Sequence, residues 1–170
     1  MSEQSPRVVW VTGPSGAGRK TAINALEDLG FEVIDNLPLR LLPAVMKDAV
    51  AGDRLALGLD VRNRDFSMNA MLDAMEDLAR NPNSGVQLLY LDSSPEVLLR
   101  RYSETRRRHP LSPAETAEVG IDRELDLLAP IRARADILLD TSEMTPHDLK
   151  AEIERQFAIG QEGNLAVSIQ

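Results

Sequence analysis

Short apolar runs recur along the chain at intervals that suit a layered α/β fold. They predict strands at Val8–Thr12, Phe31–Asp35, Leu55–Val61, Val86–Asp92 and Asp136–Asp140. Val, Ile and Leu dominate these runs and do not alternate with polar residues, which is typical of strands buried on both faces of a parallel sheet. The pattern therefore predicts one central sheet that is covered on both sides.

The segments between these runs have helical periodicity. Helices are predicted at Arg19–Leu29, Leu39–Val50, Asp65–Arg80, Pro95–Arg107, Ala114–Ala133 and Thr145–Ile159. Ser94 and Thr145 each precede a proline, which places a capping residue before a first-turn proline. Alternating strands and helices imply right-handed crossovers, so the fold class is α/β with helices on both faces of a parallel sheet.

A glycine-rich segment connects the first predicted strand to the first predicted helix. It follows the nucleotide-binding pattern G-x-x-x-x-G-K-(S/T) as far as its third glycine, and its residues are Gly13, Pro14, Ser15, Gly16, Ala17, Gly18, Arg19, Lys20 and Thr21. Glycines let the backbone fold around phosphates, with N–H groups pointing inward at the helix N-terminus. The segment predicts a phosphate cradle; a glycine turn without a ligand is the alternative.

Two side chains of this loop depart from the pattern. Arg19 stands in place of lysine, and Lys20 stands in place of the serine or threonine, so that Thr21 comes one residue late. Arginine keeps the positive charge and can donate to phosphate, but it is bulkier than lysine and not equivalent to it. Lys20 cannot ligate Mg²⁺, because Mg²⁺ takes oxygen ligands and an ammonium group has no lone pair. We expect phosphate binding through Arg19, with Mg²⁺ binding and hydrolysis weakened.

Composition narrows the class of protein. The chain has 170 residues, 43% of them hydrophobic, which suits one globular domain. It has no cysteine, which excludes disulfides and a thiol nucleophile and fits the cytoplasm. Neither a long apolar run nor a signal peptide is present, so we expect a soluble cytoplasmic protein without a membrane segment. The net charge of −8 argues against broad nucleic-acid binding by this chain alone.

Acidic residues lie at the ends of two of the predicted strands, at the sheet edge where ligands bind in α/β folds. Asp60 ends the stretch LALGLD, the position from which an acid helps to hold Mg²⁺; a turn cap is the alternative. Arg62 follows it and could reach a phosphate or form a surface ion pair. Asp35 and Asn36 suit either a ligand contact or a simple turn and helix cap.

An arginine-rich stretch carries most of the local positive charge. RRYSETRRRH, from Arg100 to His109, holds five arginines in ten residues. Such arginines can close over phosphates and stabilise their charge. A solvated helix face, paired with Glu96 and Glu104, and a contact with RNA are the alternatives.

Several longer segments resemble one known family. GFEVIDNLP, DVRN, RRYSETRRRHPL and IDRELDLLAPIRARADILLDTSEMTPHDL closely resemble the N-terminal domain of the RapZ/YvcJ family of bacterial P-loop nucleotide-binding proteins, and the resemblance covers the chain from about Arg7. It implies a kinase-like P-loop NTPase fold. We expect a five-stranded parallel sheet in the order 2-3-1-4-5, flanked by helices, in which the strand ending at Asp60 lies beside Val8–Thr12.

The resemblance also implies ligands and partners. Family members bind and hydrolyse ATP and GTP, with ATP assigned to the loop and GTP to DVRN, here Asp60, Val61, Arg62 and Asn63. Enterobacterial members are RNase adapters that present a small regulatory RNA to a ribonuclease, mainly through a C-terminal domain. We therefore expect a nucleotide-binding domain at 1–159, a linker and the start of a missing domain at 160–170, and a homo-oligomer at full length.

Two functions stay open at this point. One is a nucleotide-binding module with weak ATPase or GTPase activity, which the intact glycines and Asp60 favour. The other is a non-catalytic regulatory or oligomerisation domain of a small-RNA-binding RNase adapter, which the altered loop favours.

Overall fold

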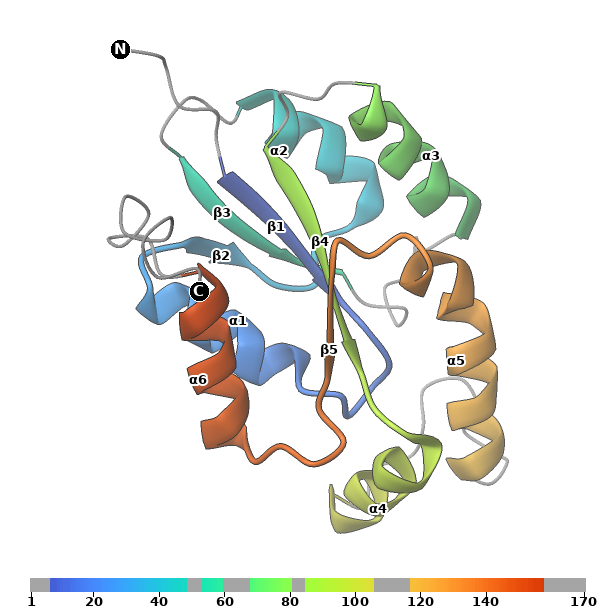
Figure 1. Cartoon of the computed structure of the whole chain (residues 1–170). Helices are drawn as coiled ribbons and strands as arrows, with labels where there is room; N and C mark the ends of the chain where they lie inside the picture. The colour runs from blue at the N-terminus through green and yellow to red at the C-terminus, as the bar shows by residue number, and fades with distance from the viewer. Residues whose placement is uncertain (1–6, 49–52, 60–67, 81–84, 106–116, 158–170) are drawn as a thin grey trace.

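The computed structural model of the chain describes residues 7–48, 53–59, 68–80, 85–105 and 117–157. Its centre is a parallel sheet of five strands in the order β2-β3-β1-β4-β5 (Figure 1), as predicted. The strands are β1 Arg7–Thr12, β2 Glu32–Ile34, β3 Arg54–Gly58, β4 Val86–Asp92 and β5 Ile137–Asp140. The apolar runs thus form the sheet, and the two edge strands are the shortest ones.

A helix forms in each of the predicted helical segments. The helices are α1 Arg19–Asp28, α2 Leu42–Asp48, α3 Met68–Ala79, α4 Pro95–Thr105, α5 Ala117–Arg132 and α6 Pro146–Phe157, and a short 3-10 turn, η1 at Leu39–Leu41, precedes α2. The caps are present: Val97 N–H donates to Ser94 Oγ at 3.3 Å, and Asp148 N–H donates to Thr145 Oγ1 at 3.0 Å. Thr145 N–H in turn donates to Asp148 Oδ2 at 3.1 Å, a reciprocal cap that fixes where α6 begins.

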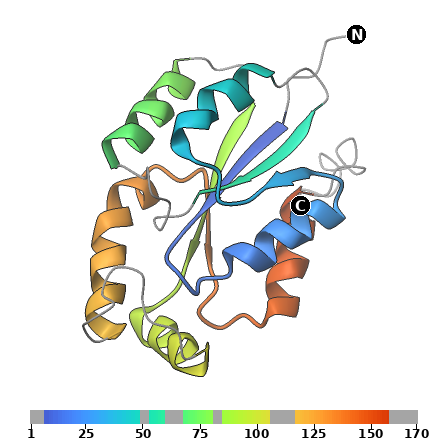
Figure 2. The ribbon, with the colours of Figure 1, turned by 180° about the vertical axis from the view of Figure 1, so that it is seen from behind.

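Alternate side chains of β1 point into two separate cores, one on each face of the sheet. Val9 and Val11 pack with α1 and α6, whereas Val8 and Trp10 pack with α2, α3 and α5. Figures 1 and 2 show the same division, with α1 and α6 side by side on one face. The strand that leads into the glycine loop is therefore buried on both faces, and this packing fixes the position at which the loop begins.

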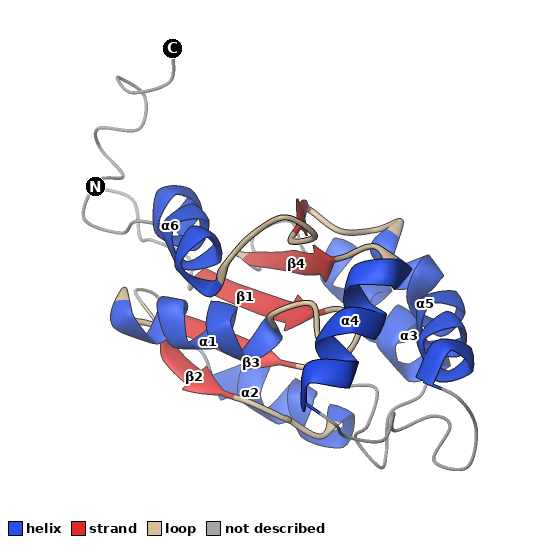
Figure 3. Ribbon diagram, turned by 90° about the horizontal axis from the view of Figure 1, so that it is seen from below, coloured by secondary structure: helices blue, strands red, loops and turns tan. Residues whose placement is uncertain are grey.

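The carboxyl ends of all five strands meet at one edge of the sheet, because all strands are parallel (Figure 3). β1 lies between β3 and β4, so the chain leaves β1 toward one side of the sheet and later returns on the other. Ligands of open α/β sheets bind at such a point. The glycine loop after β1 occupies it.

Candidate functional site

The loop after β1 begins and ends in a backbone conformation that only glycine adopts readily. Gly13 has φ 151° and Gly18 has φ 107°. A Cβ on Gly13 would collide with the backbone oxygen of Leu91, and one on Gly18 would lie 2.6 Å from Leu149 Cδ2. These positions are therefore dictated by the close approach of β4 and α6 to the loop.

Helix α1 starts directly at the end of this loop. Gly18 is its N-cap, and no side chain caps the helix. The first intrahelical bond runs from Ala22 N–H to Gly18 O at 3.0 Å, so the preceding N–H groups have no partner within the helix. Uncapped N–H groups and the helix dipole together favour an anion at this place.

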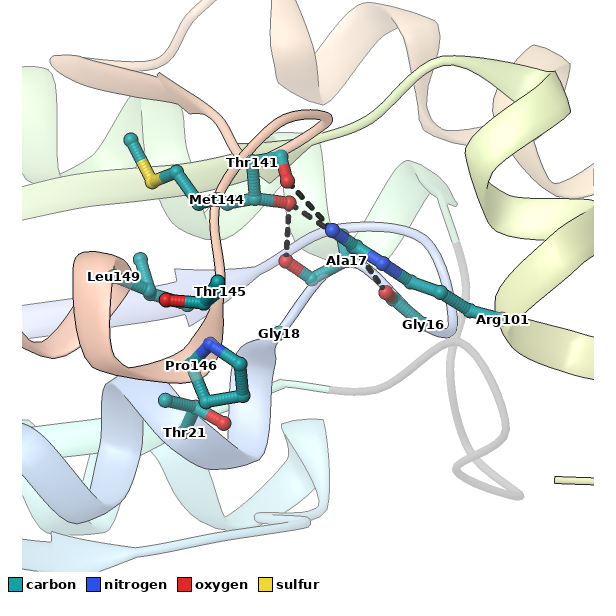
Figure 4. A pocket seen from close by; sticks show the side chains of 10 residues that line it. All are labelled: Gly16, Ala17, Gly18, Thr21, Arg101, Thr141, Met144, Thr145, Pro146 and Leu149. Carbon is teal, nitrogen blue, oxygen red and sulfur yellow. Dashed lines mark hydrogen bonds between the residues drawn. The ribbon is translucent and has the colours of Figure 1, made fainter. Parts of the chain in front are cut away.

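Two residues from distant elements hold the other side of the loop, and we call them the clasp. Thr141, directly after β5, donates its hydroxyl to the Ala17 carbonyl oxygen at 2.7 Å (Figure 4). Arg101 of α4 donates to the Gly16 carbonyl oxygen at 2.8 Å and to the Thr141 carbonyl oxygen at 2.6 Å. Thr141 is almost fully buried. The clasp thus binds carbonyl groups of the loop and ties them to β5 and α4.

A buried carboxylate holds the start of the loop. Glu124 of α5 is completely buried, and it accepts hydrogen bonds from Ser15 N–H at 2.9 Å and from Ser15 Oγ at 3.0 Å. It belongs to the buried stripe of α5, which is Gly120, Ile121, Glu124, Leu128 and Ile131. A glutamate inside an apolar stripe is the sequence signal that could have identified it, since buried acids are rare unless they are paired.

A cavity of about 190 Å³ opens beside the loop. Figure 4 shows Arg101 on one side of it and Met144, Pro146 and Leu149 on the other. The full lining is Gly16, Ala17, Gly18, Thr21, Arg101, Thr141, Met144, Thr145, Pro146 and Leu149. The cavity is smaller than the roughly 300–1,000 Å³ of pockets that enclose a drug-sized ligand, so it suits one ring system of a ligand.

The side chain of Arg19 reaches the turn after β2. Its Nε lies 3.3 Å from Asp35 Oδ1, and its Nη2 donates to Asn36 Oδ1 at 3.3 Å. Lys20, by contrast, is exposed. The structure therefore brings Asp35 and Asn36 to the glycine loop, which sequence reasoning had left open between a ligand contact and a simple turn.

The edge beside the clasp carries further charges. Hydrogen bonds from the Ser142 hydroxyl and N–H hold the pKa of Asp140 below its usual value. The Arg132 guanidinium donates to Asp92 Oδ2 at 2.8 Å, which raises the pKa of Arg132. Burial, and then the charge of Asp92, raise the pKa of Tyr90 well above its usual value.

The structure describes only part of the predicted site. The loop from Gly13 to Thr21 is continuous and links β1 to α1. Asp60, Val61, Arg62 and Asn63 lie outside the described residues, as do Arg106, Arg107, Arg108 and His109. Of the other predicted candidates, Arg101 joins the clasp, whereas Arg100 is exposed.

Thr141 was not predicted as a site residue. It follows a strand at the carboxyl edge of the sheet, and that position is the only sequence signal for it. Within the described ranges, no three or more His, Cys, Asp or Glu side chains are grouped so as to hold a metal ion. No helix in that same part of the chain is long and apolar enough to cross a membrane.

Comparison of the sequence with known protein families identifies the family of this chain. The family model described as the RapZ-like N-terminal domain matches residues 7–161. A nucleotide-binding protein of Cereibacter sphaeroides (strain KD131) is 58% identical over 167 residues, which cover 98% of this chain and 56% of that protein. A nucleotide-binding protein of Dinoroseobacter shibae is 58% identical over 164 residues, covering 96% and 55%. The chain thus spans about half the length of these relatives.

Among solved structures, the fold is similar to that of a kinase. The shikimate kinase from Acinetobacter baumannii in complex with shikimate superposes with a TM-score of 0.64 at 18% identity, covering 98% of this chain and 97% of that one. At this identity the likeness shows the kinase-like P-loop fold alone.

Proposed function

Because the chain belongs to the RapZ-like N-terminal domain family, we propose that it binds the nucleoside triphosphates ATP and GTP at the loop from Gly13 to Thr21. The observation that carries the proposal is the loop itself: Gly18 leaves the N-terminus of α1 uncapped, while distant side chains engage the loop's carbonyl groups. The N–H groups at the start of α1 thereby suit an anion, whereas Ser15 N–H already donates to Glu124 Oε1 and Ala17 N–H to the Pro14 carbonyl oxygen. The relatives named nucleotide-binding proteins support the same ligand class.

The nucleotide has two places to occupy in this proposal. Its phosphates lie at the N-terminus of α1, where the helix dipole and the positive charges of Arg19 and Lys20 favour them. Its base enters the cavity of about 190 Å³, between Arg101 and the apolar side chains of Met144 and Pro146. A guanidinium group and apolar surfaces both favour a flat aromatic ring.

Hydrolysis is the weaker part of the proposal. A Mg²⁺ ion neutralises phosphate charge when bound, but Lys20 presents an ammonium group where the pattern has a hydroxyl, and an ammonium group cannot ligate a metal. Asp60 stays the candidate metal ligand, and Asp60, Val61, Arg62 and Asn63 stay the candidate GTP contacts. We therefore propose at most slow ATPase or GTPase activity.

A regulatory role is the second candidate, and the altered loop favours it. In this proposal residues 1–159 form a nucleotide-responsive domain of a longer cytoplasmic, homo-oligomeric protein, and the chain continues from 160 onward into a second domain. Small regulatory RNA and a ribonuclease are the proposed partners of the full-length protein.

Calorimetric titration with ATP and GTP, each with and without Mg²⁺, tests the proposal. Gly18→Ala should weaken binding at least tenfold, because its Cβ would approach Leu149 Cδ2 to 2.6 Å at φ 107°. Gly30→Ala is the matched control: Gly30 also has a positive φ, of 98°, but it lies at the other end of α1, and its Cβ would meet only Arg54 Nη1, at an ordinary contact distance of 3.7 Å. Absence of saturable binding below about 1 mM, or equal effects of both variants, would refute the proposal.

A further inference from the structure

The carboxylate of Asp35 is fitted closely against strand β3. A Cβ on Gly58 would overlap Asp35 Oδ1 and lie 3.1 Å from Asp35 Cγ. Two hydrogen bonds from backbone N–H groups fix the turn: Asn36 N–H donates to the side-chain oxygen Asp35 Oδ1 at 2.9 Å, and Leu37 N–H donates to the Gly58 carbonyl oxygen at 3.1 Å. Asn36 adopts φ 57°, which non-glycine residues seldom do. The turn after β2 therefore holds this carboxylate in one defined place.

Arg19 meets Asp35 from the other side. It is the first residue of α1 and occupies the lysine position of the phosphate-binding pattern. Its side chain is 13% exposed and that of Asp35 is 31% exposed, so the pair is partly shielded from water. The approach of Nε to Asp35 Oδ1 at 3.3 Å does not have hydrogen-bond geometry. The attraction between Arg19 and Asp35 is therefore mainly one of charge, while the same guanidinium also donates from Nη2 to Asn36 Oδ1 at 3.3 Å.

We propose that Asp35 limits how strongly the loop binds phosphate, because it holds the Arg19 guanidinium at the end of β2 and cancels its charge. The inference rests on the proposed nucleotide binding at the same loop. A phosphate group that binds the Arg19 guanidinium must compete for it with the Asp35 carboxylate. Asp35 is thus a positioning residue that acts on the nucleotide through Arg19.

The charges around the pair favour this role over a metal site. Arg19 lies at ion-pair distance from Asp35, and Lys20 follows it in the chain. Two positive side chains disfavour a divalent cation at this carboxylate, because like charges repel more strongly where water is partly excluded. A role in holding Mg²⁺ predicts the opposite result in the experiment below.

Asp35→Asn is the direct test, since it removes the charge and keeps the size of the side chain. The 170-residue chain would be titrated with ATP at low and at high salt, with and without Mg²⁺. We expect the Kd for ATP to fall about three- to tenfold at low salt, and the gain to shrink at high salt, because salt screens charges. A purely structural role of Asp35 would not produce this salt dependence.

Asp28→Asn is the matched control. Asp28 is the last residue of α1 and pairs with Lys150 at 3.3 Å, so this change also removes one carboxylate from an ion pair on the same helix. Asp28 lies far from the loop. The Kd of the Asp28→Asn variant for ATP should therefore equal that of the parent chain. Gly58→Ala is a second, independent variant, because its Cβ would push the Asp35 carboxylate away from its place; it should also tighten binding.

The outcomes separate this inference from the proposed function. If the parent chain does not bind ATP at all, the proposed function fails. If the parent binds ATP and Asp35→Asn binds it equally or more weakly, the inference is wrong while the proposed function stands. Weaker binding by Asp35→Asn only when Mg²⁺ is present would instead assign Asp35 to the metal and overturn the inference as well.

Discussion

Thr141 and Ala17 are 124 residues apart, yet the Thr141 hydroxyl donates to the Ala17 carbonyl oxygen at 2.7 Å. Thr141 N–H also donates to the Asp92 carbonyl oxygen at 2.8 Å, so the same residue is joined to the end of β4. The shape of the phosphate-binding loop is therefore set by a residue far along the sequence as well as by the loop's own glycines.

Thr141→Val should destabilise the chain by about 1–3 kcal/mol, because it leaves the buried Ala17 carbonyl oxygen without this donor. ATP binding should weaken as well, since the loop loses one of its attachments. Urea unfolding and calorimetric titration measure the two effects. Thr141→Ser keeps the hydroxyl and should retain most of the binding; a serine variant as impaired as the valine variant would contradict this explanation.

Lys20→Ser should increase the dependence of ATP binding on Mg²⁺ and raise any rate of phosphate release. The change restores a hydroxyl where the phosphate-binding pattern has its metal ligand and removes a competing cation. Titration with and without Mg²⁺, together with a phosphate-release assay, measures both effects.

Lys47→Ser serves as its control, because Lys47 is an exposed residue of α2 and its loss changes the net charge by the same amount. The prediction for Lys20 is wrong if the two variants show the same metal dependence and the same turnover.

Arg19→Ala should weaken ATP binding by about 1–3 kcal/mol, the usual loss for a hydrogen bond to a charged group. It also leaves the Asp35 carboxylate without its ion-pair partner. Arg19→Lys keeps the charge and should recover part of the affinity. Unchanged affinity of the alanine variant would show that Arg19 takes no part in binding.

Tyr90→Phe should leave stability at pH 7 unchanged or raise it by up to about 1 kcal/mol, because the Tyr90 hydroxyl is buried and makes no hydrogen bond to the described residues. Burial, and then the charge of Asp92, raise the pKa of Tyr90 above its usual 10.0. As the pH rises past about 10, the unfolded chain therefore loses the phenol proton first, and stability falls.

The phenylalanine variant should resist this alkaline loss, and thermal unfolding between pH 8 and 11 would show the difference (roughly the range around an ordinary tyrosine pKa). Tyr102→Phe removes a phenol from a partly exposed place and is the control. An identical alkaline slope for Tyr90→Phe and the parent would contradict the prediction.

The chain alone should bind small RNAs weakly at physiological salt. Its net charge is −8, and phosphate contacts need a basic surface. A gel-shift titration with a structured small RNA checks this, with an unrelated RNA of equal length as the control. Tight and specific binding by this chain would contradict the prediction.

Much of the fold followed from the sequence, and parts of the site did not. The Val-, Ile- and Leu-rich runs predicted the strands, and the family resemblance supplied their order. The apolar stripe of α5 could have marked Glu124 as buried, but its contact with Ser15 could not be predicted, because no local pattern records which loop α5 packs against. The pairing of Arg19 with Asp35 depends on β2 and α1 meeting in space, which no local pattern records.

The distance along the chain between the loop and Thr141 also matters while the protein is being made. The ribosome adds about 5–20 residues per second, so the Ala17 carbonyl waits roughly 6–25 s for the hydroxyl that will bind it 124 residues later. β1, the centre of the sheet, likewise lacks its β4 neighbour until Val86–Asp92 has emerged. A nascent chain thus carries a finished glycine sequence long before it carries a finished nucleotide site.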